Sequence, residues 1–208
     1  CYRLWTKSRH KRLHKHQKAE ILRSDLAPLM LEIAQWGIQE IGELSMLDLP
    51  SPGSIAQAQE LLVSLQAIEA TGKITSHGKK LLQLGLHPRL AHMILTAQAL
   101  GLAETSCLIA ALLTEKDFLK GNNSDLGERV ALLQAIKTRK TTRLESIDKH
   151  QCQRVLKTAS ELQQRLKRTL KISTTSSEES SSELTGVLLA FAYPDRIAKL
   201  RNNRDQRY

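Results

Sequence analysis

Apolar positions between residues 24 and 38 recur at the spacing of an α-helix. They are Leu26, Leu29, Met30, Ile33 and Trp36, and on a helix they share one face. Ser24 or Asp25 can cap the start of this helix, and Pro28 falls in the first turn, where a missing N–H costs nothing. Gly37 predicts its end. The pattern therefore predicts an amphipathic helix whose apolar face belongs to the core.

The following segment changes from a helical to a strand-like pattern. The run SIAQAQELLVSLQAIEATG predicts a second helix from a Ser54 cap to Gly72. Lys73–Thr75 then predicts a short β-segment, and Ser76–Gly78 predicts a turn. Two helices followed at once by a short strand and a turn are typical of a small winged-helix unit.

From Pro88 onward the pattern is helical, with one interruption. The interruption is STTSSEESSSE, residues 173–183, which has no apolar residue and predicts a disordered loop inside the domain. Aromatic residues make up only 3% of the chain, which disfavours a sandwich or a barrel. The predicted fold class is mainly α, with a small winged-helix domain followed by a helical bundle. The helical segments of the bundle are 88–101, 103–119, 126–140, 148–172 and 184–200.

The net charge of the chain indicates what kind of partner it binds. The chain carries 31 Lys and Arg against 21 Asp and Glu, for a net charge of +10. This excess favours an acidic partner, most commonly nucleic acid, although a basic protein without such a partner remains an alternative. The run KSRHKRLHKHQK, residues 7–18, indicates a solvated linker or one that faces nucleic acid. A metal site is disfavoured because His10, His14 and His16 have no acidic or thiol ligand beside them.

The longest helical segment carries a basic stripe. Arg154, Lys157, Arg165 and Arg168 lie at steps of three, eight and three, which places them close to one face of a helix, with Glu161 between them. Val155, Ala159, Leu162 and Leu166 form a separate apolar stripe. More cations precede this helix, namely Lys137, Arg139, Lys140 and Arg143. The stripe is either a solvated face or a surface for the backbone of nucleic acid, and the few aromatic residues make base stacking a minor contribution.

Motifs for catalysis are missing from the sequence. There is no G-x-x-x-x-G-K-[ST] loop, no carboxylate pair of the DEAH type, no G-x-S-x-G and no HExxH, so no catalytic or metal-ligating residue is assigned. Cys1, Cys107 and Cys152 are scattered, which fits a reducing cytoplasmic compartment. No apolar run reaches membrane-spanning length, and we expect no membrane contact.

The stretch LGLHPRLAHMIL, residues 84–95, combines packing residues with side chains that could form a site. Pro88 can start a helix, and leucines on both sides can pack. His87 and His92 have no nearby acidic or thiol partner in sequence, which disfavours a metal. We interpret the stretch as a joint between two packed units, in which Arg89 forms an ion pair across the junction.

Several of these segments resemble one region of the DEAH-box helicases. CYRLW resembles the strand after the last helicase motif. The pattern that opens the winged-helix domain is matched by Glu20, Ile21, Leu22, Arg23 and Leu26. The wing and the stretch after it match at Thr75, Gly78, Pro88, Arg89, Leu90 and Ala91. The segments LGLHPRLAHM, AALLTEKDFLKG and GVLLAFAYPDRIAK look like the bacterial HrpB-type ATP-dependent helicases.

The resemblance implies a helicase-associated region with four parts. Residues 1–23 would hold the end of the second RecA-like domain and a basic linker, 24–87 the winged helix, 88–200 the helical ratchet domain, and 201–208 a linker toward an OB-like domain. ATP and Mg2+ would bind in motor domains that precede this region. The region would help to hold single-stranded nucleic acid, RNA as the resemblance implies, as a cytoplasmic monomer.

Two other functions stay open at this point. One is a free-standing winged-helix DNA-binding protein, although the predicted second helix has no Lys or Arg to meet phosphates. The other is a helical protein-interaction module whose charge is incidental.

Overall fold

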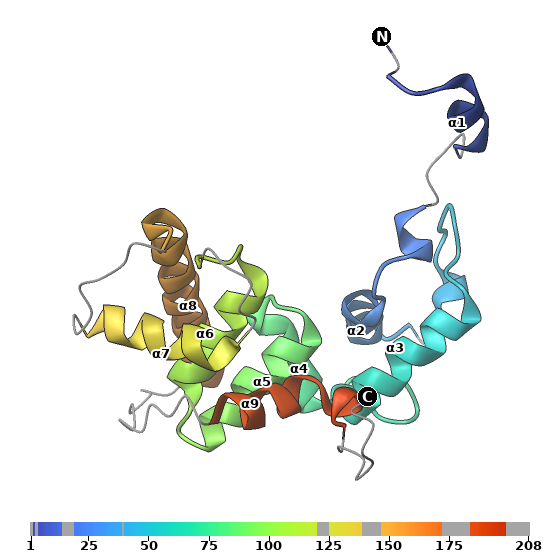
Figure 1. Cartoon of the computed structure of the whole chain (residues 1–208). Coiled ribbons are helices and arrows are strands. Elements are labelled where there is room, and N and C mark those ends of the chain that lie inside the picture. The colour runs from blue at the N-terminus through green and yellow to red at the C-terminus, as the bar shows by residue number, and fades with distance from the viewer. Residues whose placement is uncertain are drawn as a thin grey trace, which may run out of the picture.

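The structure is a computed structural model that describes residues 2, 4–13, 19–38, 40–119, 125–138, 147–171 and 184–198. Helices joined by short connections make up this part of the chain (Figure 1). The helices are α1 (Lys7–Arg12), α2 (Ala27–Trp36), α3 (Pro52–Ser64), α4 (Ser76–Leu84), α5 (Pro88–Ala99), α6 (Ala103–Thr114), α7 (Leu126–Lys137), α8 (Lys149–Leu170) and α9 (Thr185–Ala192), with short 3-10 helices η1 (Glu20–Leu22), η2 (Ile41–Glu43) and η4 (Pro194–Arg196).

The described residues contain no extended strand. Their only β-pairing is two isolated antiparallel bridges, Ile68 with Ile74 and Leu119 with Ile147. The prediction of a mainly α fold is confirmed. The division into a winged helix and a ratchet domain stays a prediction, and the loop 173–183 lies outside the described residues.

Local signals place α2 as the sequence predicts. The Asp25 carboxylate accepts a hydrogen bond from the Ala27 backbone N–H at 2.9 Å, Pro28 lies in the first turn, and Gly37 ends the helix at φ 82°. Met30 and Ile33 are buried. The placement of Trp36 in the core is wrong, because this side chain at the last turn of the helix is 66% exposed.

The segment between α3 and α4 differs from the prediction. Ser51, rather than Ser54, caps α3, and α3 ends at Ser64 rather than near Gly72. The predicted turn at Ser76–Gly78 is the first turn of α4, because the Thr75 hydroxyl accepts from the Gly78 N–H at 2.9 Å. The same hydroxyl donates to the Gln66 carbonyl at 2.7 Å, so a contact nine residues back in the chain positions the helix start.

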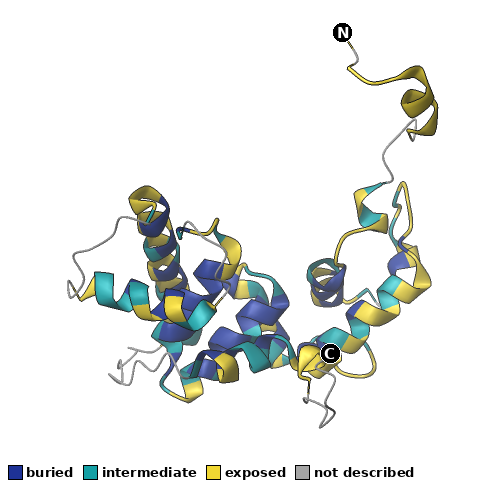
Figure 2. Cartoon of the chain, viewed as in Figure 1, coloured by how far each residue is buried: buried dark blue, intermediate teal, exposed yellow. Residues whose placement is uncertain are grey.

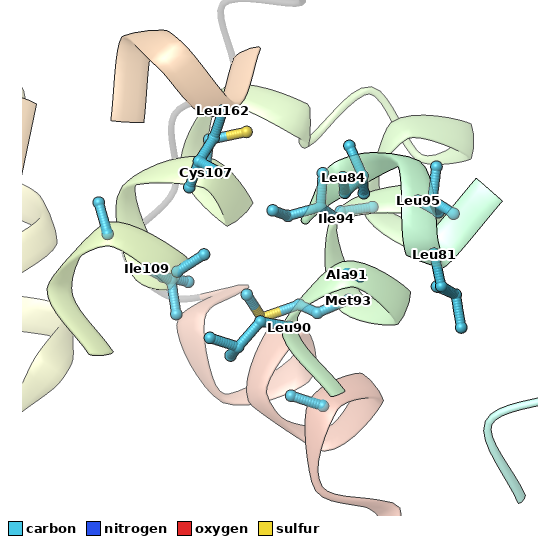
Figure 3. Packing of buried hydrophobic residues seen from close by; sticks show 14 of the residues in the cluster. Leu81, Leu84, Leu90, Ala91, Met93, Ile94, Leu95, Cys107, Ile109 and Leu162 are labelled. Atoms are coloured by element: carbon cyan, nitrogen blue, oxygen red, sulfur yellow. The ribbon is translucent and has the colours of Figure 1, made fainter. Parts of the chain in front are cut away.

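The core lies where α4, α5, α6 and α8 meet, and α9 covers the other side of α5 (Figure 3). Most of α5 and α6 is buried, whereas α1 has no buried residue (Figure 2). Each fully buried leucine contributes about 1.5–3 kcal/mol of hydrophobic stabilisation. The labelled core residues are Leu81 and Leu84 of α4, Leu90, Ala91, Met93, Ile94 and Leu95 of α5, Cys107 and Ile109 of α6, and Leu162 of α8.

Candidate nucleic-acid interface

Helix α8 has the two-sided character that the sequence predicts. The Asp148 carboxylate caps it by accepting from the Gln151 N–H at 3.0 Å, and 22 residues follow without a break. The predicted apolar stripe is buried against α6 and α4, with Val155, Ala159, Leu162 and Leu166 all at most 3% exposed. Arg154, Lys157, Arg165 and Arg168 are exposed, as predicted.

The four cations of the predicted stripe on α8 are not equivalent. The Arg154 guanidinium lies 3.1 Å from a carboxylate oxygen of Glu115, and the Thr158 hydroxyl donates to the other oxygen at 2.9 Å. Glu115 is only 18% exposed at its side chain, so this acid is held against α8. Arg154 therefore has an internal partner that a phosphate would have to displace.

The remaining cations of the stripe are less constrained. The Lys157 ammonium lies 3.9 Å from Glu161, and both side chains are largely exposed, which makes this pair weak. The Arg165 guanidinium donates to the Leu84 carbonyl at the end of α4 at 3.3 Å, and no carboxylate of the described residues pairs with it. Arg168 is exposed and forms no ion pair with any described residue. Within the predicted stripe, Arg165 and Arg168 are thus the cations without a carboxylate partner among the described residues.

The cations that precede α8 in sequence do not extend the stripe in the described structure. Lys137, the last residue of α7, pairs with Glu104 at the start of α6. Arg139, Lys140 and Arg143 lie outside the described residues. Their assignment to a nucleic-acid surface stays a prediction.

The TEKDF stretch after α6 connects two helices through adjacent carboxylates. Glu115 contacts Arg154 of α8, as described above. Asp117 forms a two-armed ion pair with Arg129 of α7, whose Nε lies 3.1 Å from both carboxylate oxygens. Arg129 is 6% exposed, and its Nη1 also donates to the Asp125 carbonyl at 2.9 Å. The hydrogen bonds from Arg129 lower the pKa of Asp117 below its usual value. Sequence reasoning missed this pair, which is structural.

The joint at residues 84–95 contains the ion pair predicted for Arg89. The Arg89 guanidinium donates to both carboxylate oxygens of Asp195, at 2.5 and 2.9 Å, and to the Ala192 carbonyl at 3.2 Å. It also lies 5.2 Å from the centre of the Tyr193 ring. The hydrogen bonds to Asp195 raise the pKa of Arg89, and the same bonds lower the pKa of Asp195. The residues after α9 are thereby fastened to the start of α5.

The histidines of this joint have partners that the sequence did not reveal. His87 lies 3.1 Å from the Asp25 carboxylate, 62 residues earlier in the chain. His92 Nδ1 lies 2.9 Å from His77 Nε2, which joins α5 to α4. Burial, with a smaller contribution from His77, lowers the pKa of His92 to about 4, and burial also lowers the pKa of His77. Both imidazoles are therefore neutral at pH 7.

The described residues do not contain three histidine, cysteine or carboxylate side chains placed to share a metal ion. Burial raises the pKa of the Cys107 thiol to about 12, so this cysteine is a packing residue. None of the helices that the structure describes is both long and apolar enough to cross a lipid bilayer.

Comparisons with known proteins agree on one family. The ATP-dependent RNA helicase HrpB of Escherichia coli is 33% identical over 205 residues, which is 99% of this chain. Over nearly its whole length, the chain is similar to one region of HrpB. A crystal structure of Escherichia coli DEAH/RHA helicase HrpB matches 95% of the chain with a TM-score of 0.69 and 30% identity.

More distant relatives match a smaller part of the chain. The probable ATP-dependent RNA helicase DHX35 of Homo sapiens is 30% identical over 114 residues, or 54% of the chain. No family model matches. The chain spans about a fifth of the length of Escherichia coli HrpB, 22% of the sequence and 22% of the crystallised chain. The similarity therefore shows the fold, and it covers one region of those proteins.

Proposed function

We propose that this chain is an accessory region of an ATP-dependent RNA helicase of the HrpB family, and that its α8 face contacts the backbone of single-stranded nucleic acid. The observation that carries the proposal is the two-sided burial of α8. One side packs on α6 and α4, and the other presents Arg165 and Arg168 to solvent without a carboxylate partner among the described residues. Because nothing on this face reads base edges, binding would be independent of sequence.

The role in the longer protein follows from this surface. Motor domains that bind ATP and Mg2+ would move the strand, and this region would hold it between steps. The region itself would contribute no catalytic group. We also expect a cytoplasmic monomer, with the motor domains and an OB-like domain of the same polypeptide as its neighbours.

A salt titration tests the proposal. Binding of the 208-residue chain to a fluorescent oligouridine is measured by anisotropy, and each phosphate contact contributes about 0.7 to the slope of log affinity against log salt. The variant carries Lys157→Gln, Arg165→Gln and Arg168→Gln, and its slope is expected to be shallower by about 2 if all three contact phosphates. Arg154 is left intact because removing it would leave the half-buried Glu115 without its cation.

The matched control removes the same charge from exposed lysines on other segments of the chain, through Lys73→Gln, Lys79→Gln and Lys116→Gln. An equal change of slope in both variants would refute a specific α8 surface. Tight, site-specific binding to duplex DNA would instead favour a winged-helix DNA-binding protein, and no binding to either probe would favour a protein-interaction module. A melting curve for each variant separates lost contacts from lost folding.

A further inference from the structure

An acidic side chain from another part of the chain contacts the predicted basic stripe of α8. Glu115 follows directly after α6, where the backbone turns to an extended conformation with φ −95° and ψ 163°. One oxygen of its carboxylate accepts a hydrogen bond from Arg154 Nη2 at 3.1 Å, and the other accepts from the Thr158 hydroxyl at 2.9 Å. Because residues four apart lie on the same face of a helix, the carboxylate bridges two neighbouring positions of α8.

The two acids of this stretch hold their arginines with unequal strength. Asp117 binds Arg129 through two nitrogens, and the Arg129 side chain is only 7% exposed. The Arg154 side chain is 57% exposed, and its hydrogen bond to Glu115 comes from one nitrogen. Breaking a buried ion pair is costly, whereas a pair that solvent screens contributes little. The pair of Arg154 with Glu115 is therefore the one that an incoming anion can exchange.

Exchange at Arg154 would not leave Glu115 without a hydrogen bond. The Thr158 hydroxyl would continue to donate to the carboxylate, and solvent would reach the part of the side chain that is exposed. A phosphate accepts two parallel hydrogen bonds from a guanidinium as well as a carboxylate does, so it can replace Glu115 with the same geometry. The cost of the exchange is thus limited to breaking one partly exposed ion pair.

We propose that Glu115 is an internal competitor for the phosphates of a bound strand. It neutralises Arg154 in the absence of a strand and releases it when a phosphate takes its place. The inference rests on the function proposed for α8, and it adds what limits the affinity of that face. Since the ion pair must break before Arg154 contacts a phosphate, the competitor weakens this contact and favours release of the strand.

The substitution Glu115→Gln tests the competition, because the amide keeps the shape of the side chain and still accepts from Thr158. In the oligouridine titration of the 208-residue chain, a freed Arg154 should steepen the slope of log affinity against log salt by about 0.7. Affinity should rise about two- to fivefold, the equivalent of one partly exposed ion pair. The matched control is Glu32→Gln, an exposed acid of α2 that forms no ion pair with a described residue.

The substitution Arg154→Gln is then made in both backgrounds. In the Glu115→Gln chain it should reduce the slope by about 0.7, and in the unsubstituted chain the reduction should be smaller because Glu115 already offsets this cation. Melting curves verify that each variant is folded at the temperature of the titration. Equal effects of Arg154→Gln in the two backgrounds would overturn the proposal, as would equal effects of Glu115→Gln and Glu32→Gln.

The variant with Lys157→Gln, Arg165→Gln and Arg168→Gln separates this inference from the function proposed for α8. If that variant leaves the slope unchanged, α8 is not the binding surface, and the role of Glu115 is refuted with it. If that variant reduces the slope while Glu115→Gln behaves like its control, the α8 surface is retained and only the internal competitor is refuted.

Discussion

Replacing Arg89 by Met tests whether the joint between α5 and the residues after α9 stabilises the fold. The substitution keeps an apolar side chain of similar length and removes the guanidinium, with its bonds to Asp195 and to the Ala192 carbonyl. Hydrogen bonds to charged groups contribute about 1.5–3 kcal/mol each in protein interiors. Because the Asp195 side chain is 48% exposed and becomes hydrated when Arg89 is absent, we expect the lower part of that range, about 2 kcal/mol in total.

This loss is measured by urea unfolding and by thermal melting. For a chain of this length, about 2 kcal/mol corresponds to a drop of roughly 4–8 °C in Tm. The matched control is Lys137→Met, which breaks an ion pair whose two side chains are 51% and 42% exposed and which should cost less than about 1 kcal/mol. A double-mutant cycle with Asp195→Asn isolates the pair from the packing of the Arg89 stem.

Two outcomes would contradict the reasoning. If Arg89→Met and Lys137→Met cost the same, the burial of the Arg89 guanidinium does not strengthen its ion pair. If the cycle gives no coupling between Arg89 and Asp195, the stabilisation comes from the Ala192 carbonyl or from packing instead. In either case the joint would not be the electrostatic connection described above.

Two further predictions concern the contacts of α4, with α5 at His92 and with the Ala67 backbone at Gly78. The folded-state pKa of His92, about 4, lies below the value of about 6.5 in the unfolded chain, so the unfolded state binds the proton first as the pH falls. The free energy of unfolding that neutral His92 contributes should therefore be fully present above pH 6.5 and should decline toward pH 4. The expected loss is about 2 kcal/mol after allowance for partial exposure. Urea titrations at several pH values measure this decline, and His92→Gln should make it shallower. Gly78→Ala should cost more than about 2 kcal/mol, because the added Cβ would lie 2.1 Å from the Ala67 carbonyl oxygen. Gly42→Ala, where no atom lies within 4 Å of the new Cβ, is the control, and equal melting temperatures would show that α4 moves away freely.

Much of the helical framework could be predicted from short-range signals. Pro88 starts α5, Asp125 caps α7 and Gly37 ends α2, each through a backbone requirement that is visible within a few residues. The start of α4 could not be predicted in this way. It depends on the Thr75 hydroxyl reaching the Gln66 carbonyl, and that contact exists only when the chain has already turned back after α3.

The partners of charged side chains were predicted less well than their positions. Helical spacing correctly predicts that Arg154 and Arg168 are exposed on α8, because this depends only on which face is apolar. It does not predict that Glu115, 39 residues before Arg154, neutralises one of them. For the same reason Asp25 beside His87 and Asp195 beside Arg89 were beyond local reasoning, since folding brings these pairs together from 62 and 106 residues apart.

This difference changes where an anionic strand would bind. Counted along the sequence, the predicted stripe of α8 offers four equal cations, but in the folded chain Glu115 and Glu161 offset two of them. Arg165 and Arg168 have no carboxylate partner among the described residues, so a phosphate meets their charge without displacing an acid. The salt dependence of binding should therefore fall more when Arg165 and Arg168 are replaced by Gln than when Arg154 and Lys157 are replaced by Gln.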